Sequence, residues 1–212
     1  MKHAFDFALT TYCQARCRSC ARTNEHTGEK EDWLELKHMD YDVFKKVLES
    51  SKVFTPDRCD WIQFCGELGD PCMHPKIEEF VDLSLLHANC VHINTNGGLR
   101  QPAWYKKLAS YGSKIKIKFG IDGVNHDTNW KYREGVDFDR AMKNMETYFH
   151  NDGVGSWHFL IFDWNWHQIT EAQRIADNIG AEIQFKWNTR SFGKITDENR
   201  IKAQELLDTC NQ

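Results

Sequence analysis

The segment Phe5-Asp6-Phe7-Ala8-Leu9-Thr10 runs directly into Thr11-Tyr12-Cys13-Gln14-Ala15-Arg16-Cys17-Arg18-Ser19-Cys20. Apolar and polar side chains alternate in the first part, which predicts a β-strand with one buried face. The second part places three cysteines in the loop that follows this strand. The carboxyl end of the first strand is therefore expected to carry a cluster of thiols.

The pattern of a strand followed by a helix repeats along the chain. We expect further strands at residues 61–65, 90–95, 114–119, 157–162 and 182–187. We expect helices at 40–51, from Pro75 through Leu85, and at 102–111, 137–150, 168–179 and 197–208. Six strands alternating with six helices predict an α/β fold with a parallel sheet, whose strands carry functional loops at their carboxyl ends.

The first predicted helix, at 40–51, has a defined start and an apolar side. Asp40 is placed to cap its N-terminus. Val43, Val47 and Leu48 recur at helical spacing and are expected to form its apolar side. The polar segment before it, at about 21–39, is expected to be a functional or mobile loop.

Length and composition narrow the class of protein. The chain has 212 residues, 41% of them hydrophobic, and a net charge of -4. This is enough for one domain, which we expect to span residues 1–212. No apolar run is long enough to cross a membrane and the N-terminus has no signal-peptide core, so a cytoplasmic protein without a membrane partner is expected. The negative net charge argues against a nucleic-acid partner.

The eight cysteines indicate a metal or redox site. A disulfide framework is not expected in a chain without a secretory signal. Four cysteines would complete a zinc tetrahedron, whereas Cys13, Cys17 and Cys20 leave one coordination position open. An open position suits a [4Fe-4S] cluster whose fourth iron binds another molecule. The alternative is a structural zinc site completed by His26 or by a distant cysteine.

The C-x3-C-x2-C spacing after a first strand resembles the radical S-adenosylmethionine (SAM) superfamily. Three later segments, each at the end of a predicted strand, add to the resemblance. Cys65-Gly66-Glu67 is similar to the Gly-Gly-Glu motif of that family, and Asn94-Thr95-Asn96-Gly97 is similar to its Thr-Asn-Gly segment. Gly120-Ile121-Asp122-Gly123, followed by Tyr132-Arg133-Glu134-Gly135, is similar to segments of the peptide-modifying members.

The resemblance implies a partial (β/α)6 barrel of the TIM type, over roughly residues 5–187. It implies a [4Fe-4S] cluster on Cys13, Cys17 and Cys20, and reductive cleavage of SAM to methionine and a 5'-deoxyadenosyl radical that abstracts hydrogen from a substrate. It also implies a reductant such as flavodoxin or ferredoxin.

The resemblance also implies roles for residues that bind SAM. Glu67 holds the amino group and Arg133 pairs with the carboxylate, while Asp122 lies near the ribose. The other implied SAM contacts are Gly66, Asn94 and Asn96, and Lys118 is a further candidate for the SAM carboxylate.

Three features depart from the family. Position 19 is often aromatic and close to the adenine, but here it is Ser19, so that contact must come from elsewhere or from Tyr12. The first glycine of Gly-Gly-Glu is replaced by Cys65. Peptide-modifying members often have cysteines for auxiliary clusters in a C-terminal extension; only Cys210 lies near this C-terminus, so we expect no auxiliary cluster.

Alternation along the strands predicts a polar barrel interior. The apolar set is expected to face outward under the helices: Phe5, Phe7, Leu9, Ile62, Phe64, Val91, Ile93, Ile115, Ile117, Phe119, Ile183, Phe185 and Trp187. The opposite set then faces inward: Asp6, Ala8, Gln63, Cys65, His92, Asn94, Lys116, Lys118, Gln184 and Lys186, which His158 could join.

Inward lysines have a structural and a functional interpretation. In the structural one, Lys116 pairs with Asp6 or Glu182 in a buried network, or the strand at 114–119 is a solvated edge. In the functional one, Lys118 and Lys186 hold an anionic substrate or the SAM carboxylate. Cys65, inward and next to Glu67, is a candidate hydrogen donor to a substrate radical, although a buried cysteine also serves as a small apolar residue.

The expected function is thus a radical SAM enzyme that acts on a polar substrate, a peptide or a small anionic metabolite. The alternative is a non-catalytic zinc- or iron-sulfur-binding domain. A nucleic-acid-modifying protein is supported only by Arg16, Arg18 and Arg22 beside the cysteines. The tryptophans at 157, 164 and 166 are expected to pack in the core or in a lid rather than to stack on bases.

Overall fold

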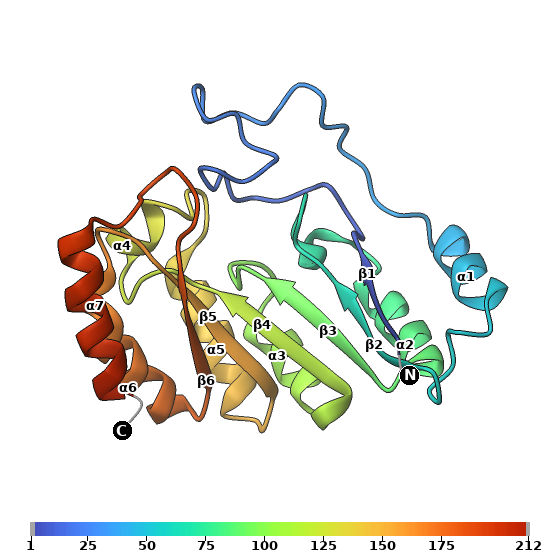
Figure 1. Ribbon diagram of the computed structural model, residues 1–212. Coiled ribbons are helices and arrows are strands. Elements are labelled where there is room, and N and C mark those ends of the chain that lie inside the picture. The colour runs from blue at the N-terminus through green and yellow to red at the C-terminus, as the bar shows by residue number, and fades with distance from the viewer. Residues whose placement is uncertain (1–2, 211–212) are drawn as a thin grey trace.

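Six parallel strands form one sheet in the order of the sequence (Figure 1). The structure is a computed structural model and describes residues 3–210. The strands are β1 (His3–Phe7), β2 (Cys59–Phe64), β3 (Cys90–Thr95), β4 (Ile115–Gly120), β5 (Val154–Ile161) and β6 (Glu182–Trp187). Each strand pairs with the next, and the sheet is open between β1 and β6. This is the predicted partial (β/α)6 barrel.

Helices connect the strands and cover the outer face of the sheet (Figure 1). They are α1 (Tyr41–Ser50), α2 (Ile77–His87), α3 (Pro102–Ala109), α4 (His126–Trp130), α5 (Phe138–Phe149), α6 (Ile169–Ile179) and α7 (Asp197–Cys210). Short 3-10 helices lie at η1 (Pro71–Met73), η2 (Gly112–Lys114) and η3 (Trp166–Gln168). The sequence did not predict α4, because a helix of five residues is too short to show an amphipathic repeat.

The apolar side predicted for α1 is only partly right. Asp40 caps the helix as expected, because its side chain accepts a hydrogen bond from the Val43 backbone. However, Val43 and Val47 are 55% and 40% exposed, whereas Phe44 and Leu48 are buried. Phe44 packs edge-on against Phe7 of β1 at 4.9 Å between ring centroids. The large ring at position 44 thus decides which side of α1 faces the sheet.

Strand β1 is shorter than predicted and β5 is longer. Residues 8–10 leave the sheet, and the Leu9 carbonyl accepts a hydrogen bond from the Met39 backbone instead. Strand β5 begins at Val154, because residues 154–158 pair with β4 from Lys116 to Gly120. The end of β1 and the start of β5 have no local sequence signal, because each is set by the segment with which the strand pairs.

The predicted alternation of faces is confirmed. Ile62, Ile93 and Phe119 are fully buried on the outer face, as are their apolar neighbours on β2, β3 and β4. The inner face carries the predicted polar set. Strand β4 lies between β3 and β5, so the alternative in which it is a solvated edge is wrong. Within residues 3–210, no helix is both long and apolar enough to cross a membrane.

Candidate active site

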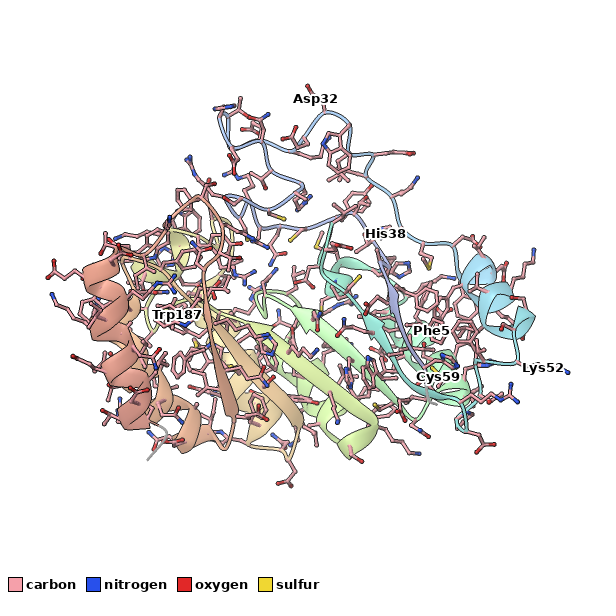
Figure 2. The ribbon with its side chains drawn as sticks, viewed as in Figure 1. Phe5, Asp32, His38, Lys52, Cys59 and Trp187 are labelled. Carbon is pink, nitrogen blue, oxygen red and sulfur yellow. The ribbon has the colours of Figure 1, made fainter. Side chains whose placement is uncertain are left out.

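The cysteine loop and the strand ends enclose one cavity of about 470 Å³. The loop after β1 crosses over the carboxyl ends of the strands (Figure 1), and Asp32 lies at the outer end of the segment that follows it (Figure 2). Cys13, Cys17 and Cys20 all line the cavity. The predicted residues that join them are Gly66, Glu67, Asn94, Asn96, Lys118 and Arg133. Side chains far apart in the sequence therefore meet at one site.

Arg22 holds the cysteine loop from within. Its guanidinium donates hydrogen bonds to the carbonyl oxygens of Cys13 and Ala15 at 3.0 and 3.1 Å, and to that of Thr11 at 3.3 Å. The side chain is buried, with 7% exposure. Arg22 is thus a structural residue of the loop, and it does not support the alternative of a nucleic-acid partner. A buried arginine needs several acceptors, which here are carbonyls of the loop.

The other two arginines also have partners within the chain. Arg16 forms an ion pair with Glu134 at 2.8 Å, and the Arg18 guanidinium lies 5.6 Å from the centre of the Phe192 ring. The three arginines therefore do not form a free basic surface, which removes the main support for a nucleic-acid partner.

Gly69 brings the turn after β2 against the cysteine loop. A side-chain carbon at this position would press into the Thr10 carbonyl and lie 2.7 Å from the Tyr12 oxygen. The next residue, Asp70, donates its backbone N–H to the Tyr12 carbonyl at 2.9 Å. Only glycine allows this approach of two backbones.

Asp70 then ties this turn to the end of β3. Its buried carboxylate accepts hydrogen bonds from the Cys72 backbone, the Thr95 hydroxyl and the Asn96 backbone, all at 2.9 to 3.1 Å. Burial raises the pKa of Asp70, while these donors oppose the shift. The sequence does not predict this role for Asp70, because its place in a Gly-Asp-Pro turn is the only local signal.

The surroundings of the thiols suit ligands of an iron-sulfur cluster. Burial raises the pKa of Cys13 to about 12 and also raises that of Cys17, so both are neutral as free thiols. N–H groups approach both sulfurs: Asn96 Nδ2 lies 3.8 Å from Cys13 Sγ, and Arg133 Nη1 lies 3.9 Å from Cys17 Sγ. Such donors favour the thiolate that metal binding requires.

The arrangement of the three thiols is compatible with a cluster. Among residues 3–210, no three His, Cys, Asp or Glu side chains gather closely enough to hold one metal ion. The thiols that hold a [4Fe-4S] cluster each bind a different iron, so they need not converge on one atom. Cys13, Cys17 and Cys20 line one cavity, as such ligands require.

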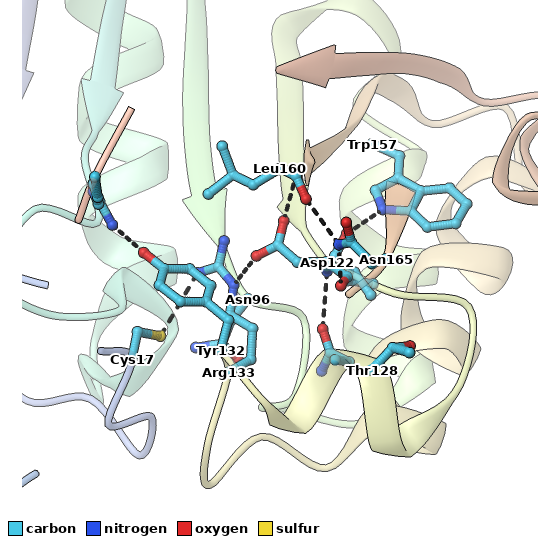
Figure 3. Close-up of polar contacts among 12 residues, drawn as sticks. Cys17, Asn96, Asp122, Thr128, Tyr132, Arg133, Trp157, Leu160 and Asn165 are labelled. Carbon is cyan, nitrogen blue, oxygen red and sulfur yellow. Dashed lines mark hydrogen bonds and ion pairs between the residues drawn. The ribbon is translucent and has the colours of Figure 1, made fainter. Parts of the chain in front are cut away.

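The Arg133 side chain lines the cavity and is held there by a buried carboxylate (Figure 3). Its Nε donates to Asp122 Oδ2 at 2.7 Å, and Asp122 Oδ1 accepts a hydrogen bond from the Leu160 backbone at 2.7 Å. Asp122 is fully buried and does not line the cavity. Its carboxylate contacts Arg133 and the backbone of β5.

Glu67 and Asn94 offer groups without a protein partner. Glu67 is exposed at the cavity and forms no ion pair within the described residues. The side-chain oxygen of Asn94 is buried without a hydrogen bond, which is costly unless a ligand supplies a donor. Asn96 lies beside them and accepts a hydrogen bond from Gln14 at 2.6 Å. This rim is therefore suited to a ligand that carries an ammonium group and further N–H or O–H groups.

Two residues that were expected to contact SAM or the substrate do not line the cavity. Tyr12 stacks on His38 at 4.6 Å between ring centroids, and it is not among the cavity-lining residues. Cys65 is half-buried and is also absent from the lining within the described part of the chain. The aromatic ring that does line the cavity is that of Tyr132, whose hydroxyl accepts a hydrogen bond from Arg190. The sequence does not predict this position for the Tyr132 ring.

The inner lysines lie on neighbouring parts of the sheet. Lys118 donates to Gln63 Oε1 at 3.0 Å, and Gln63 in turn donates to Asp6 at 2.6 Å. Lys186 Nζ lies 3.2 Å from His158 Nδ1. Lys116 forms no ion pair with Asp6 or Glu182 in the described structure, so the structural interpretation in which it pairs with one of them is not supported. Among the described residues, the side chain that donates to the Asp6 carboxylate is that of Gln63.

The tryptophans after β4 serve packing, as expected. Trp157 is fully buried and donates to the Ile121 carbonyl at 2.7 Å. Trp164 stacks on Phe162 at 4.6 Å, and Trp166 packs against the core. Their rings are engaged within the protein, which excludes the base-stacking alternative for Trp157.

Comparison with known proteins identifies the superfamily to which the chain belongs. Residues 7–174 match the radical SAM superfamily, so the chain belongs to this superfamily. Members use a [4Fe-4S] cluster and SAM, which are therefore the cofactors of this chain. A curated relative is the tungsten-containing aldehyde ferredoxin oxidoreductase cofactor-modifying protein of Pyrococcus furiosus, 25% identical over 196 residues, which cover 89% of this chain and 51% of the relative.

Solved structures show the same fold. Native anSMEcpe with bound AdoMet has a TM-score of 0.70 at 14% identity, covering 97% of this chain and 60% of that one. Streptococcus suis SuiB bound to the precursor peptide SuiA has a TM-score of 0.71 at 15% identity, covering 98% and 46%. Methylornithine synthase (PylB) has a TM-score of 0.61 at 13% identity, covering 97% and 62%. The chain thus spans about half to three fifths of the length of these proteins.

Proposed function

We propose that the chain catalyses reductive cleavage of SAM and uses the resulting radical to abstract hydrogen from a polar substrate. The observation that carries the proposal is the meeting of Cys13, Cys17 and Cys20 with Glu67 and Arg133 at one cavity. Three thiols alone suit a metal site, but thiols beside a free carboxylate and a guanidinium suit a cluster with an amino-acid ligand.

Each residue has a role that follows from its charge and position. Cys13, Cys17 and Cys20 would each bind one iron of the cluster and leave the fourth iron without a protein ligand. Glu67 would accept hydrogen bonds from the SAM ammonium group, and Arg133 would pair with the SAM carboxylate. Asn94 and Asn96 would hold the remaining polar groups of SAM, and the backbone at Gly66 leaves room for it. When bound, the two cofactors together supply the electron and the 5'-deoxyadenosyl radical that abstracts hydrogen.

Asp122 and Asp70 act as positioning residues in this proposal. Asp122 holds the Arg133 guanidinium at the cavity and compensates its charge. Asp70 fixes the backbone of Asn96, which lies beside Cys13. A rigid arrangement of this kind is what orients a bound molecule and limits the access of water to it.

The proposed substrate is a peptide or a small polar molecule. The polar inner face supports a peptide or a small polar molecule. The likeness to SuiB, solved with a precursor peptide, supports the first choice, and the name of the Pyrococcus furiosus relative supports modification of a cofactor. A reductant such as flavodoxin or ferredoxin is proposed as the electron donor. The described geometry gives no support to Cys65 as hydrogen donor, because Cys65 does not line the cavity.

The test is a triple variant, Cys13→Ala, Cys17→Ala and Cys20→Ala, compared with Cys210→Ala. Both proteins are reconstituted with iron and sulfide without oxygen, and then assayed for bound iron and for 5'-deoxyadenosine formed from SAM. We expect the triple variant to lose both, whereas Cys210→Ala, which lies at the end of α7, keeps both. Cleavage of SAM by the triple variant, or stoichiometric zinc in place of iron in the wild-type protein, would refute the proposed function.

A further inference from the structure

The inner face of the sheet carries positive charge that the chain does not neutralise. Lys118 of β4 and Lys186 of β6 both line the cavity. Neither forms an ion pair with a carboxylate in the described structure: Lys118 contacts the Gln63 amide and Lys186 contacts the His158 ring. The nearby Glu182 accepts its hydrogen bond from Gln184. Two ammonium groups therefore line one cavity, and neither forms an ion pair with a carboxylate of the described residues.

Lys118 is partly buried and lies near enough to Lys186, which is exposed, to be influenced by its charge. Burial lowers the pKa of Lys118, the positive charge of Lys186 lowers it further, and the Asp6 carboxylate opposes the shift. Like charges close to each other at a partly buried site are unfavourable unless an opposite charge lies between them.

His158 links the lysines and is held in one tautomer. A lysine ammonium group has only donors, so the Lys186 contact requires His158 Nδ1 to accept. The proton of the neutral ring is then on Nε2, which donates to the Ser156 hydroxyl at 3.0 Å. This hydrogen bond fixes the ring and steers Lys186 toward the cavity. The arrangement orients a cation for an incoming group.

These cations have other partners than the group that suits the SAM carboxylate, although Arg133 is near enough to His158 to lower the pKa of its ring. The Arg133 guanidinium adjoins the cysteines, with Nη1 at 3.9 Å from Cys17 Sγ. Lys118 instead points toward Gln63 on β2, and Lys186 points toward His158 on β5. SAM has one carboxylate, for which Arg133 is sufficient. The lysine pair is therefore available to another anion.

We propose that Lys118 and Lys186 together bind an anionic oxygen group of the substrate, a carboxylate or a phosphate. This inference rests on the proposed function and specifies its substrate class. Ammonium groups on two different strands can each donate to one oxygen of such a group, while Gln63 and His158 keep them in place. The bound anion would hold the rest of the substrate at a set distance from the cysteine loop.

The experiment measures anion binding without turnover. The cluster-loaded, SAM-loaded protein with 13C-labelled histidine rings is titrated separately with inorganic phosphate and with acetate, and NMR follows the His158 signal, which is assigned by its absence in His158→Gln. We expect a saturable shift with one or both anions, the tighter of which identifies the class of the group. Lys118→Met and Lys186→Met should each weaken this binding about ten-fold, the usual order for loss of one charge-assisted contact.

Lys106→Met is the matched control. It removes the same charge from the exposed side of α3 and should leave anion binding unchanged. Iron content and melting temperature check that all variants are folded. The inference is overturned if neither anion gives a saturable shift, or if the two lysine variants bind the anions as the control does.

A second readout separates this inference from the proposed function. The affinity for SAM is measured by calorimetry in the same variants, and it should stay within two-fold of wild type, roughly 0.4 kcal/mol. A ten-fold loss of SAM affinity in both lysine variants would assign the lysines to SAM and overturn the inference. Failure of the wild-type protein to form 5'-deoxyadenosine would instead refute the proposed function, while the anion titration would still be readable.

Discussion

Arg133 is held by Asp122, a residue that has no exposure of its own. The bond from Arg133 Nε to Asp122 Oδ2 is 2.7 Å long, and the second Asp122 oxygen is occupied by the Leu160 backbone. Burial by itself lowers the pKa of Arg133, but the Asp122 carboxylate opposes this and raises the pKa above its ordinary value. The orientation of this cation at the cavity therefore depends on a buried carboxylate that does not line the cavity itself.

Replacing Asp122 with Asn should destabilise the fold and weaken SAM binding together. It leaves the Arg133 cation without its buried partner, which typically costs about 3 kcal/mol. We expect SAM affinity to fall about ten-fold, because the guanidinium is no longer oriented. Urea unfolding and calorimetry measure the two effects, and Asp57→Asn, on an exposed loop, is the control. Wild-type SAM affinity in the Asp122 variant would show that Arg133 needs no positioning.

Replacing Glu67 with Gln should weaken SAM binding without loss of the cluster. The amide keeps the shape of the side chain but removes the charge that faces the SAM ammonium group, so about a ten-fold loss is expected. Calorimetry with SAM and iron analysis measure the two quantities, and Glu205→Gln on α7 serves as the control. Unchanged SAM affinity would remove Glu67 from the site.

Replacing Gly69 with Ala should disturb the cysteine loop. The added carbon would collide with the Thr10 carbonyl and lie 2.7 Å from that of Tyr12, so the loop must shift. We expect a loss of stability of about 2 kcal/mol or more and incomplete cluster assembly. Gly112→Ala is the control, because that site has a positive φ but open space around it, and a loss of only about 1 kcal/mol is expected there. Equal iron content in both variants would contradict the role of Gly69.

His158 and His92 should stay neutral in mildly acidic solution. Burial lowers the pKa of both rings to about 4; Lys186 and Lys118 lower that of His158 further, and Lys118 and Lys116 that of His92. The unfolded chain takes up protons below about pH 6.5, so stability is full above that pH and is lost as the pH falls from 6.5 toward 4. NMR titration of the two rings measures the values. A midpoint near 6.5 for His158 would mean that the lysines do not act on it.

The sequence was sufficient for the order of the elements and for the faces of the strands. Phe119 and Lys118 are neighbours in the chain, yet one is fully buried and the other lines the cavity, as alternation requires. The loops at the strand ends were equally predictable, because parallel strands place their carboxyl ends at one edge. Cys13, Glu67 and Arg133 were therefore expected to meet, and the structure brings them to one cavity.

The partners of these residues were decided only by the tertiary structure. Nothing local to Asp122 distinguishes a carboxylate that touches a ligand from one that holds an arginine, because the difference lies in the Leu160 backbone and the Arg133 side chain. From the sequence, Arg22 is likewise expected to be a surface cation, and only the folded structure shows that three backbone carbonyls accept its hydrogen bonds. Short-range pattern determines which face a side chain occupies, whereas hydrogen-bond partners depend on segments that only the folded chain brings together.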